Sequence, residues 1–156
     1  MSVNDLLGDV LALVNGELES HQILLRTEML DGLPLVMAER VQLQQVLLNL
    51  MMNAIEAMSS VTDRERVLSA SSMVSEADQV LITLKDSGTV IDPAHMDRIF
   101  DAFFTTKDRG MGMGLSICRS IVESHGGQLW ASPHSPHGTV FHLKLPSAAA
   151  NKVLDS

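Results

Sequence analysis

Three stretches of the chain repeat apolar residues at intervals of three and four positions, which is the spacing of one face of an α-helix. These stretches cover residues 4–21, 39–59 and about 113–125, with Asn4 as the candidate N-cap of the first. Shorter runs alternate apolar and polar residues or concentrate β-branched residues, as strands do. These runs are residues 23–29, 35–37, 67–74, 80–85, 128–131 and 139–145, and a short helix is expected after Pro93.

The order of these elements favours a two-layer α/β (α+β) sandwich, with helices on one face of a mixed sheet. Turn residues separate the elements, for example Asp31-Gly32 with Pro34, and Gly138 before the final strand. We expect one domain over residues 1–146, followed by a flexible tail over residues 147–156 that begins with small and polar residues.

Composition narrows the classes of protein that the chain can belong to. Of 156 residues, 46% are hydrophobic, which suits a globular domain, and no run is long and apolar enough for a membrane span. Nothing at the N-terminus resembles a secretory peptide, so we expect a soluble, cytoplasmic domain without direct membrane contact. The net charge of −8 argues against binding to nucleic acid. The single cysteine, Cys118, cannot form an internal disulfide and is expected to be buried and inert.

A glycine-rich segment precedes the third predicted helix. Gly110, Gly112 and Gly114 alternate with other residues and lead directly into its apolar pattern. Glycine allows close approach of the backbone to a ligand, and the first turn of a helix presents unpaired N–H groups to an anion. The segment is therefore a candidate phosphate site, although the same glycines could form a flexible loop that binds nothing.

Two asparagines lie four residues apart on one face of the second predicted helix. Asn49 and Asn53 interrupt an otherwise apolar pattern, where amides lower helix propensity. One interpretation is a polar pair that bonds to a neighbouring loop. The other is that an amide oxygen binds Mg²⁺, which takes few protein ligands and completes its shell with water and phosphate oxygens.

Two further segments carry candidate chemistry. Asp86-Ser87-Gly88 follows a predicted strand, where the carboxylate can accept from an exocyclic amine, or the segment can be a plain turn. Residues 100–107 hold three of the four phenylalanines and end at Lys107, just before the glycines. Lys107 and Arg109 are either cations near a phosphate or solvated surface charges.

In this order the segments resemble the ATP-binding catalytic domain of two-component sensor histidine kinases, in the superfamily that includes gyrase-, Hsp90- and MutL-type ATPases. Residues 49–54 look like the N box, 86–88 the first glycine box, 100–107 the F box, 110–115 the second glycine box and 138–139 the final one. The residues of the F box and the second glycine box are most similar to those of kinases related to the oxygen sensors of nitrogen fixation. The resemblance implies a Bergerat-type fold, with a mostly antiparallel sheet of about five strands on about three helices.

The resemblance also implies a role for each matching residue. Asn53 would bind Mg²⁺ and Asp86 the adenine amino group of ATP. The other residues implied to contact the nucleotide are Gly88, Gly110, Gly112, Met113, Gly114, Leu115 and Thr139. Asn49 stands where ATP-hydrolysing relatives have a glutamate base, and an amide cannot activate water. We therefore expect transfer of the γ-phosphoryl group to a histidine, assisted by the charge of Lys107.

The partners implied are a histidine-containing dimerisation domain of the same full-length kinase and the receiver domain of a response regulator. The acceptor helix is not recognisable in the chain, and His21 lacks its sequence context. Val90 stands where the family has a second glycine, which predicts weaker ATP binding. Two alternatives remain at this point: a degenerate nucleotide-binding regulatory module, and an anti-sigma-type serine kinase on the same fold.

Overall fold

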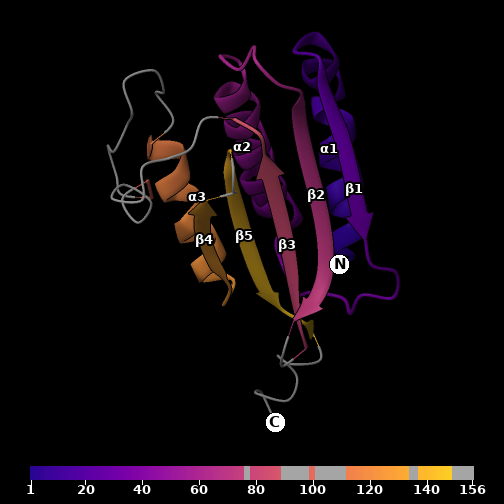
Figure 1. Ribbon diagram of the computed structural model, residues 1–156. Coiled ribbons are helices and arrows are strands. Elements are labelled where there is room, and N and C mark those ends of the chain that lie inside the picture. The colour runs from indigo at the N-terminus through magenta and orange to yellow at the C-terminus, as the bar shows by residue number, and fades with distance from the viewer. Residues whose placement is uncertain (76–77, 89–98, 101–111, 134–136, 149–156) are drawn as a thin grey trace.

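The computed structural model describes residues 1–75, 78–88, 99–100, 112–133 and 137–148. Its helices and strands follow the sequence pattern closely (Figure 1). In chain order they are α1 (Val3–Ser20), β1 (Ile23–Met29), α2 (Arg40–Met58), β2 (Arg66–Ser75), β3 (Gln79–Asp86), α3 (Gly112–Ser124), β4 (Gln128–Pro133) and β5 (Thr139–Pro146). The short helix expected after Pro93 falls outside the described residues.

The strands form one mixed sheet in the order β1-β2-β3-β5-β4. β1 and β2 are parallel and joined through α2, as a parallel pair requires a crossover. The other neighbouring pairs are antiparallel, so β3 lies at the centre between β2 and β5. The predicted sandwich with a mostly antiparallel five-stranded sheet is confirmed.

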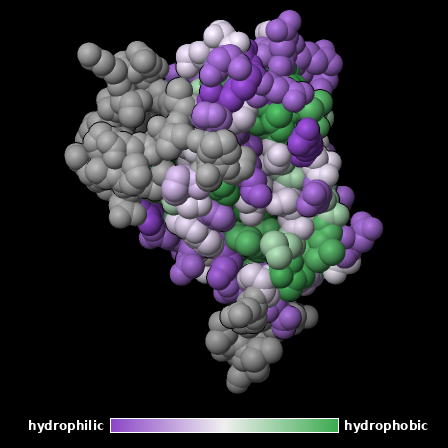
Figure 2. All heavy atoms as spheres, in the orientation of Figure 1, coloured by the Kyte–Doolittle hydropathy of each residue, from purple (hydrophilic) through white to green (hydrophobic). Residues whose placement is uncertain are grey.

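The helices pack on one face of the sheet, and they lie behind the strands in the view of Figure 1. The core fills the space between the layers, where the apolar faces of α1 and α2 meet alternate residues of β2, β3 and β5. Fully buried examples are Leu7, Leu47, Leu50, Leu68 and Leu143. On the opposite face, Figure 2 shows hydrophobic residues in separate patches among hydrophilic ones. Within the described part of the chain, no helix is long and apolar enough to cross a membrane.

The start of α1 differs from the sequence expectation. Ser2 is the N-cap, and its hydroxyl accepts the N–H of Asp5 at 3.3 Å. Asn4 lies inside the first turn, where its side-chain amide donates to the Leu30 carbonyl at 2.9 Å and its oxygen accepts the Ser72 hydroxyl at 2.6 Å. Asn4 is thus used to attach α1 to the sheet, which leaves the cap to Ser2.

The packed domain extends beyond the expected boundary at residue 146. Ser147 is fully buried and bridges Val36, and the N–H of Ala148 donates to the carbonyl of Leu35 at 2.7 Å. The expectation that the flexible tail begins at Ser147 is therefore wrong, because this residue pairs with the extended stretch predicted around Val36. Residues 149–156 lie outside the described part.

Arg66 joins the ends of the two long helices to the start of β2. Its guanidinium donates to the carbonyls of His21 at 2.8 Å, Ser59 at 3.0 Å and Val61 at 2.9 Å. His21 and Ser59 are the C-caps of α1 and α2, where carbonyl groups lack helical partners and a positive charge is favourable. This arginine fixes the end of α2 relative to the sheet.

Candidate functional site

Several of the predicted site residues that the structure describes lie around one face of α2. Asn49, Asn53 and Ala57 are four residues apart, so they lie in a row that spans about 12 Å along the helix axis. At one end of the row, a Cβ added to Gly114 of α3 would lie 3.9 Å from Nδ2 of Asn49. At the other end, a Cβ added to Gly88 would lie 2.7 Å from the carbonyl oxygen of Ala57. Asn53 therefore lies between the start of α3 and the turn that follows β3.

Asn53 is the most unusual residue of this row. Its side chain is 2% exposed, and its Oδ1 is buried without a hydrogen-bond partner among the described residues. A buried amide oxygen left in this state costs about 1–3 kcal/mol, so such atoms are rare in native proteins. An oxygen of this kind suits a hard cation, so the residue fits the Mg²⁺ ligand that the sequence predicts.

Asp86 ends β3 as a buried carboxylate, 2% exposed. Its Oδ1 accepts the backbone N–H of Gly88 at 2.9 Å and of Thr139 at 3.2 Å, which fixes the orientation of the side chain. Gly138 has φ +103°, and a Cβ there would overlap the carbonyl oxygen of Asp86. Glycine is thus required at both 88 and 138, because the backbone approaches Ala57 at one position and Asp86 at the other.

The turn after Asp86 is held by contacts that sequence reasoning did not foresee. The Ser87 hydroxyl accepts the N–H of Val67 at 2.9 Å and lies 3.1 Å from the carbonyl of Glu65, to which it donates. The Arg64 guanidinium donates from Nε to the Ser87 carbonyl at 3.1 Å and from Nη2 to the Gly88 carbonyl at 2.9 Å. Arg64 lies in the run Asp63 to Arg66, whose alternating charges read as a solvated loop, so no sequence signal singled it out.

Both ends of the Asn49 side-chain amide are hydrogen-bonded. Its Oδ1 accepts the Gln45 side-chain N–H at 3.1 Å, and its Nδ2 donates to Cys118 Sγ at 3.6 Å. Burial raises the pKa of the Cys118 thiol, which favours the protonated form. Cys118 is buried as predicted, and its contact with Asn49 attaches α3 to α2.

The glycine segment is described only in part. The third helix begins at Gly112, one residue before the expected start, and Leu115 is buried in the core at 6% exposure. Phe100, the first aromatic residue of the F box, packs edge-on against Phe141 with ring centroids 6.2 Å apart. The Arg119 guanidinium lies over the Phe100 ring, 4.8 Å from its centroid. Lys107, Gly110, Val90 and the side chain of Met113 lie outside the described residues, and their predicted roles stay predictions.

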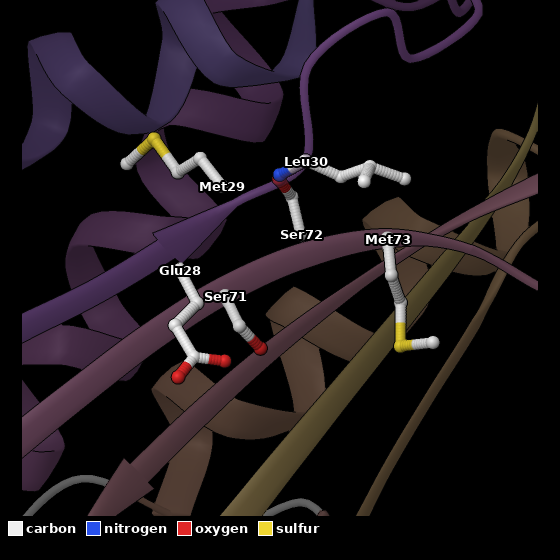
Figure 3. Close-up of a pocket in the computed structure, with 6 residues that line it drawn as sticks. All are labelled: Glu28, Met29, Leu30, Ser71, Ser72 and Met73. Carbon is white, nitrogen blue, oxygen red and sulfur yellow. The ribbon is translucent and has the colours of Figure 1, made fainter.

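A shallow pocket lies at the other end of the sheet (Figure 3). It is lined by Glu28 and Met29 of β1, by Leu30 directly after this strand, and by Ser71 to Met73 of β2. In Figure 3, Glu28, Ser71 and Met73 extend to one side of the sheet and Met29 to the other. Met73 pairs with Leu81 at the start of β3, whereas Asp86 ends this strand. The pocket contains none of the predicted site residues. In the described segments, no group of three or more His, Cys, Asp or Glu side chains is placed to hold a metal ion.

The fold and this arrangement have counterparts among known proteins. Residues 38–149 match the sequence profile described as histidine kinase-, DNA gyrase B- and HSP90-like ATPase. The sensor protein FixL of Bradyrhizobium diazoefficiens is 39% identical over 150 residues, which cover 96% of this chain and 29% of FixL. The nucleotide-free catalytic domain of histidine kinase ThkA superimposes with a TM-score of 0.80 at 35% identity, covering 94% of this chain and 93% of that domain.

A structure of ThkA in complex with the response regulator protein TrrA also matches, with a TM-score of 0.79 and 31% identity, over 97% of this chain and 42% of that one. The chain therefore belongs to the histidine kinase-, gyrase- and HSP90-like ATPase family. Within it, the chain is an ATP-binding catalytic domain of the sensor histidine kinase type, as the sequence predicted. It spans less than a third of the length of FixL.

Proposed function

We propose that this domain binds Mg·ATP and transfers the γ-phosphoryl group to a histidine on a separate dimerisation domain of the full-length kinase, for onward transfer to a response regulator. The observation that carries the proposal is the buried Oδ1 of Asn53, which has no hydrogen-bond partner in the described part of the chain and lies between the start of α3 and the Asp86 turn. The sensor kinase relatives support the same conclusion, and the ThkA–TrrA complex supports the partner class. The proposal places the domain in the cytoplasm, where ATP is available.

Each described residue has a distinct part in this proposal. The fixed carboxylate of Asp86 accepts from the adenine amino group, and the N-terminal turn of α3 holds phosphate oxygens through its first N–H groups, which have no acceptor within the helix. Asn53 holds Mg²⁺, which neutralises phosphate charge when bound. The Asn49 amide cannot take a proton from water, so it favours transfer over hydrolysis. The neutral imidazole of the acceptor forms the new N–P bond as the bond from phosphorus to the ADP oxygen breaks.

The test combines labelled ATP, this domain and a histidine-containing dimerisation domain from a related kinase known to accept phosphate. Acid-labile label on the partner is expected with the native sequence. Asn53→Ala should abolish it and should remove the increase in ATP affinity that Mg²⁺ gives. Asn15→Ala is the matched control, because Asn15 is an exposed amide on α1 whose side chain donates to Glu19, one turn further along the helix.

The alternatives give different results in the same experiment. Transfer that is unaffected by Asn53→Ala would contradict the role of Asn53 as metal ligand. Saturable ATP binding without transfer to a competent partner would indicate a regulatory module. Acid-stable label on serine would indicate an anti-sigma-type kinase. Steady hydrolysis of ATP by the domain alone would contradict the interpretation of Asn49.

A further inference from the structure

Arg64 makes a two-point contact with the backbone of the turn that follows Asp86. Its Nε and Nη2 donate to two successive carbonyl groups, those of Ser87 and Gly88, at 3.1 and 2.9 Å. Its Nη1 donates to the Asp63 carboxylate at 3.0 Å, and its side chain is 24% exposed. A guanidinium has the planar array of donors that such a contact needs, and a lysine ammonium does not.

The contact reaches Asp86 through a single peptide group. The Ser87 carbonyl and the Gly88 N–H belong to the same planar unit, so fixing one end fixes the direction of the other. Arg64 Nε holds the carbonyl end, and the N–H end donates to Oδ1 of Asp86 at 2.9 Å. Rotation of this peptide would break both bonds. The orientation of the Asp86 carboxylate thus depends on a side chain that belongs to the loop before β2.

The second carbonyl extends the contact along the chain. Gly88 is the last described residue before the segment that carries Val90, and its carbonyl is held by Nη2. Gly88 also packs directly on Ala57 of α2. The turn is therefore held both by Arg64 and by its packing on α2. Two residues further on, the family has glycine and this chain has Val90.

We propose that Arg64 is a positioning residue for nucleotide recognition, which orients the Asp86 carboxylate toward the amino group of adenine through the Ser87–Gly88 peptide. The proposal rests on the proposed function, because it assigns Asp86 to the base of ATP. It goes further, because the preference for adenine over other bases then depends on the contact of Arg64 with the turn. The expected consequence is a loss of preference for an adenine nucleotide when the two-point contact is removed.

The experiment compares ATP with inosine triphosphate, in which an oxygen replaces the amino group of the base. Binding of each is measured by calorimetry for the native domain and for Arg64→Gln and Arg64→Lys. Both variants should weaken ATP binding by about two- to tenfold, the range for loss of one net hydrogen bond, and leave inosine triphosphate within about twofold. Arg40→Gln is the matched control, because Arg40 is an exposed arginine that pairs with Asp9 on the surface.

A second measurement needs no nucleotide. Hydrogen exchange of the Gly88 amide should be slow in the native domain and at least about tenfold faster in Arg64→Gln, since opening of this bond becomes easier. Equal losses for both nucleotides would show a merely structural role and overturn the proposal, as would an unchanged preference for ATP. If the native domain fails to prefer ATP, the role of Asp86 in the proposed function fails, and Gly88 exchange alone then decides whether Arg64 orients the turn.

Discussion

From the buried oxygen of Asn53 we predict that this residue lowers the free energy of unfolding of the domain when no metal is bound. Replacing Asn53 with leucine, which has the same branching but is somewhat larger, removes an acceptor that has no partner among the described residues from a site that is 2% exposed. The penalty for such an acceptor is about 1–3 kcal/mol, and part of the gain is lost to imperfect packing of the new side chain. We expect Asn53→Leu to raise the free energy of unfolding by about 1–2 kcal/mol without nucleotide or metal, a rise in Tm of about 2–8 °C.

The assay is thermal and urea unfolding in the presence of EDTA, repeated with saturating Mg·ATP. Ligand at about one hundred times its Kd stabilises the native domain by about 2.7 kcal/mol, whereas the variant should gain little, so the order of stability should reverse. Asn49→Leu is the contrast, because both ends of that amide are hydrogen-bonded and its loss should destabilise the domain. A variant Asn53→Leu that is less stable than the native domain in EDTA would refute the reasoning, since a satisfied buried amide behaves in that way.

Three further predictions concern the surroundings of the site. Gly88→Ala should lower the free energy of unfolding by about 1–3 kcal/mol, because the new methyl would meet the Ala57 carbonyl at 2.7 Å. Gly16→Ala, in an open position of α1, should instead raise it by about 0.5–1 kcal/mol. Urea unfolding measures both changes. Because burial raises the pKa of Cys118 above 9.0, the unfolded thiol ionises first as pH rises, so stability should fall above about pH 9 more steeply than in Cys118→Ala. Equal slopes in the two proteins would contradict this. Val90→Gly should tighten ATP binding by up to about tenfold in a titration, and an unchanged Kd would show that the family pattern does not matter at this position.

Periodicity was sufficient to predict the helices and strands, because the apolar faces of α1, α2 and α3 and the alternation of the strands are continuous along the sequence. It was less informative at chain ends and helix caps, where a single long-range contact decides which residue caps the helix or where the packed domain ends. Asn4 has the right chemistry for a cap, but its contacts with Leu30 and Ser72 are long-range and invisible in a local pattern. Ser147 is small and polar, yet it is buried by pairing with Val36.

The candidate site divides in the same way. Asn53 and Asp86 could be singled out because amides in an apolar helix and a carboxylate at the end of a strand are locally unusual, and both residues are buried in the structure. Their roles toward metal and nucleotide stay predictions. Arg64 could not be singled out, since its partners are backbone carbonyls 23 and 24 residues away and a backbone carbonyl leaves no signature in the sequence. Composition gives no means to distinguish an arginine that binds the main chain from one that faces solvent.

The two amides that hold Asp86 have a consequence for the order in which the site can form. Gly88 is close by in the chain, but Thr139 begins β5 and is 53 residues away. During synthesis the asparagines of α2 and the carboxylate of β3 emerge long before Thr139 does. The hydrogen bonds to the Asp86 carboxylate therefore cannot be complete until β5 lies between β3 and β4. If Asp86 binds the base of ATP as proposed, nucleotide can stabilise only chains in which this late strand is already in place.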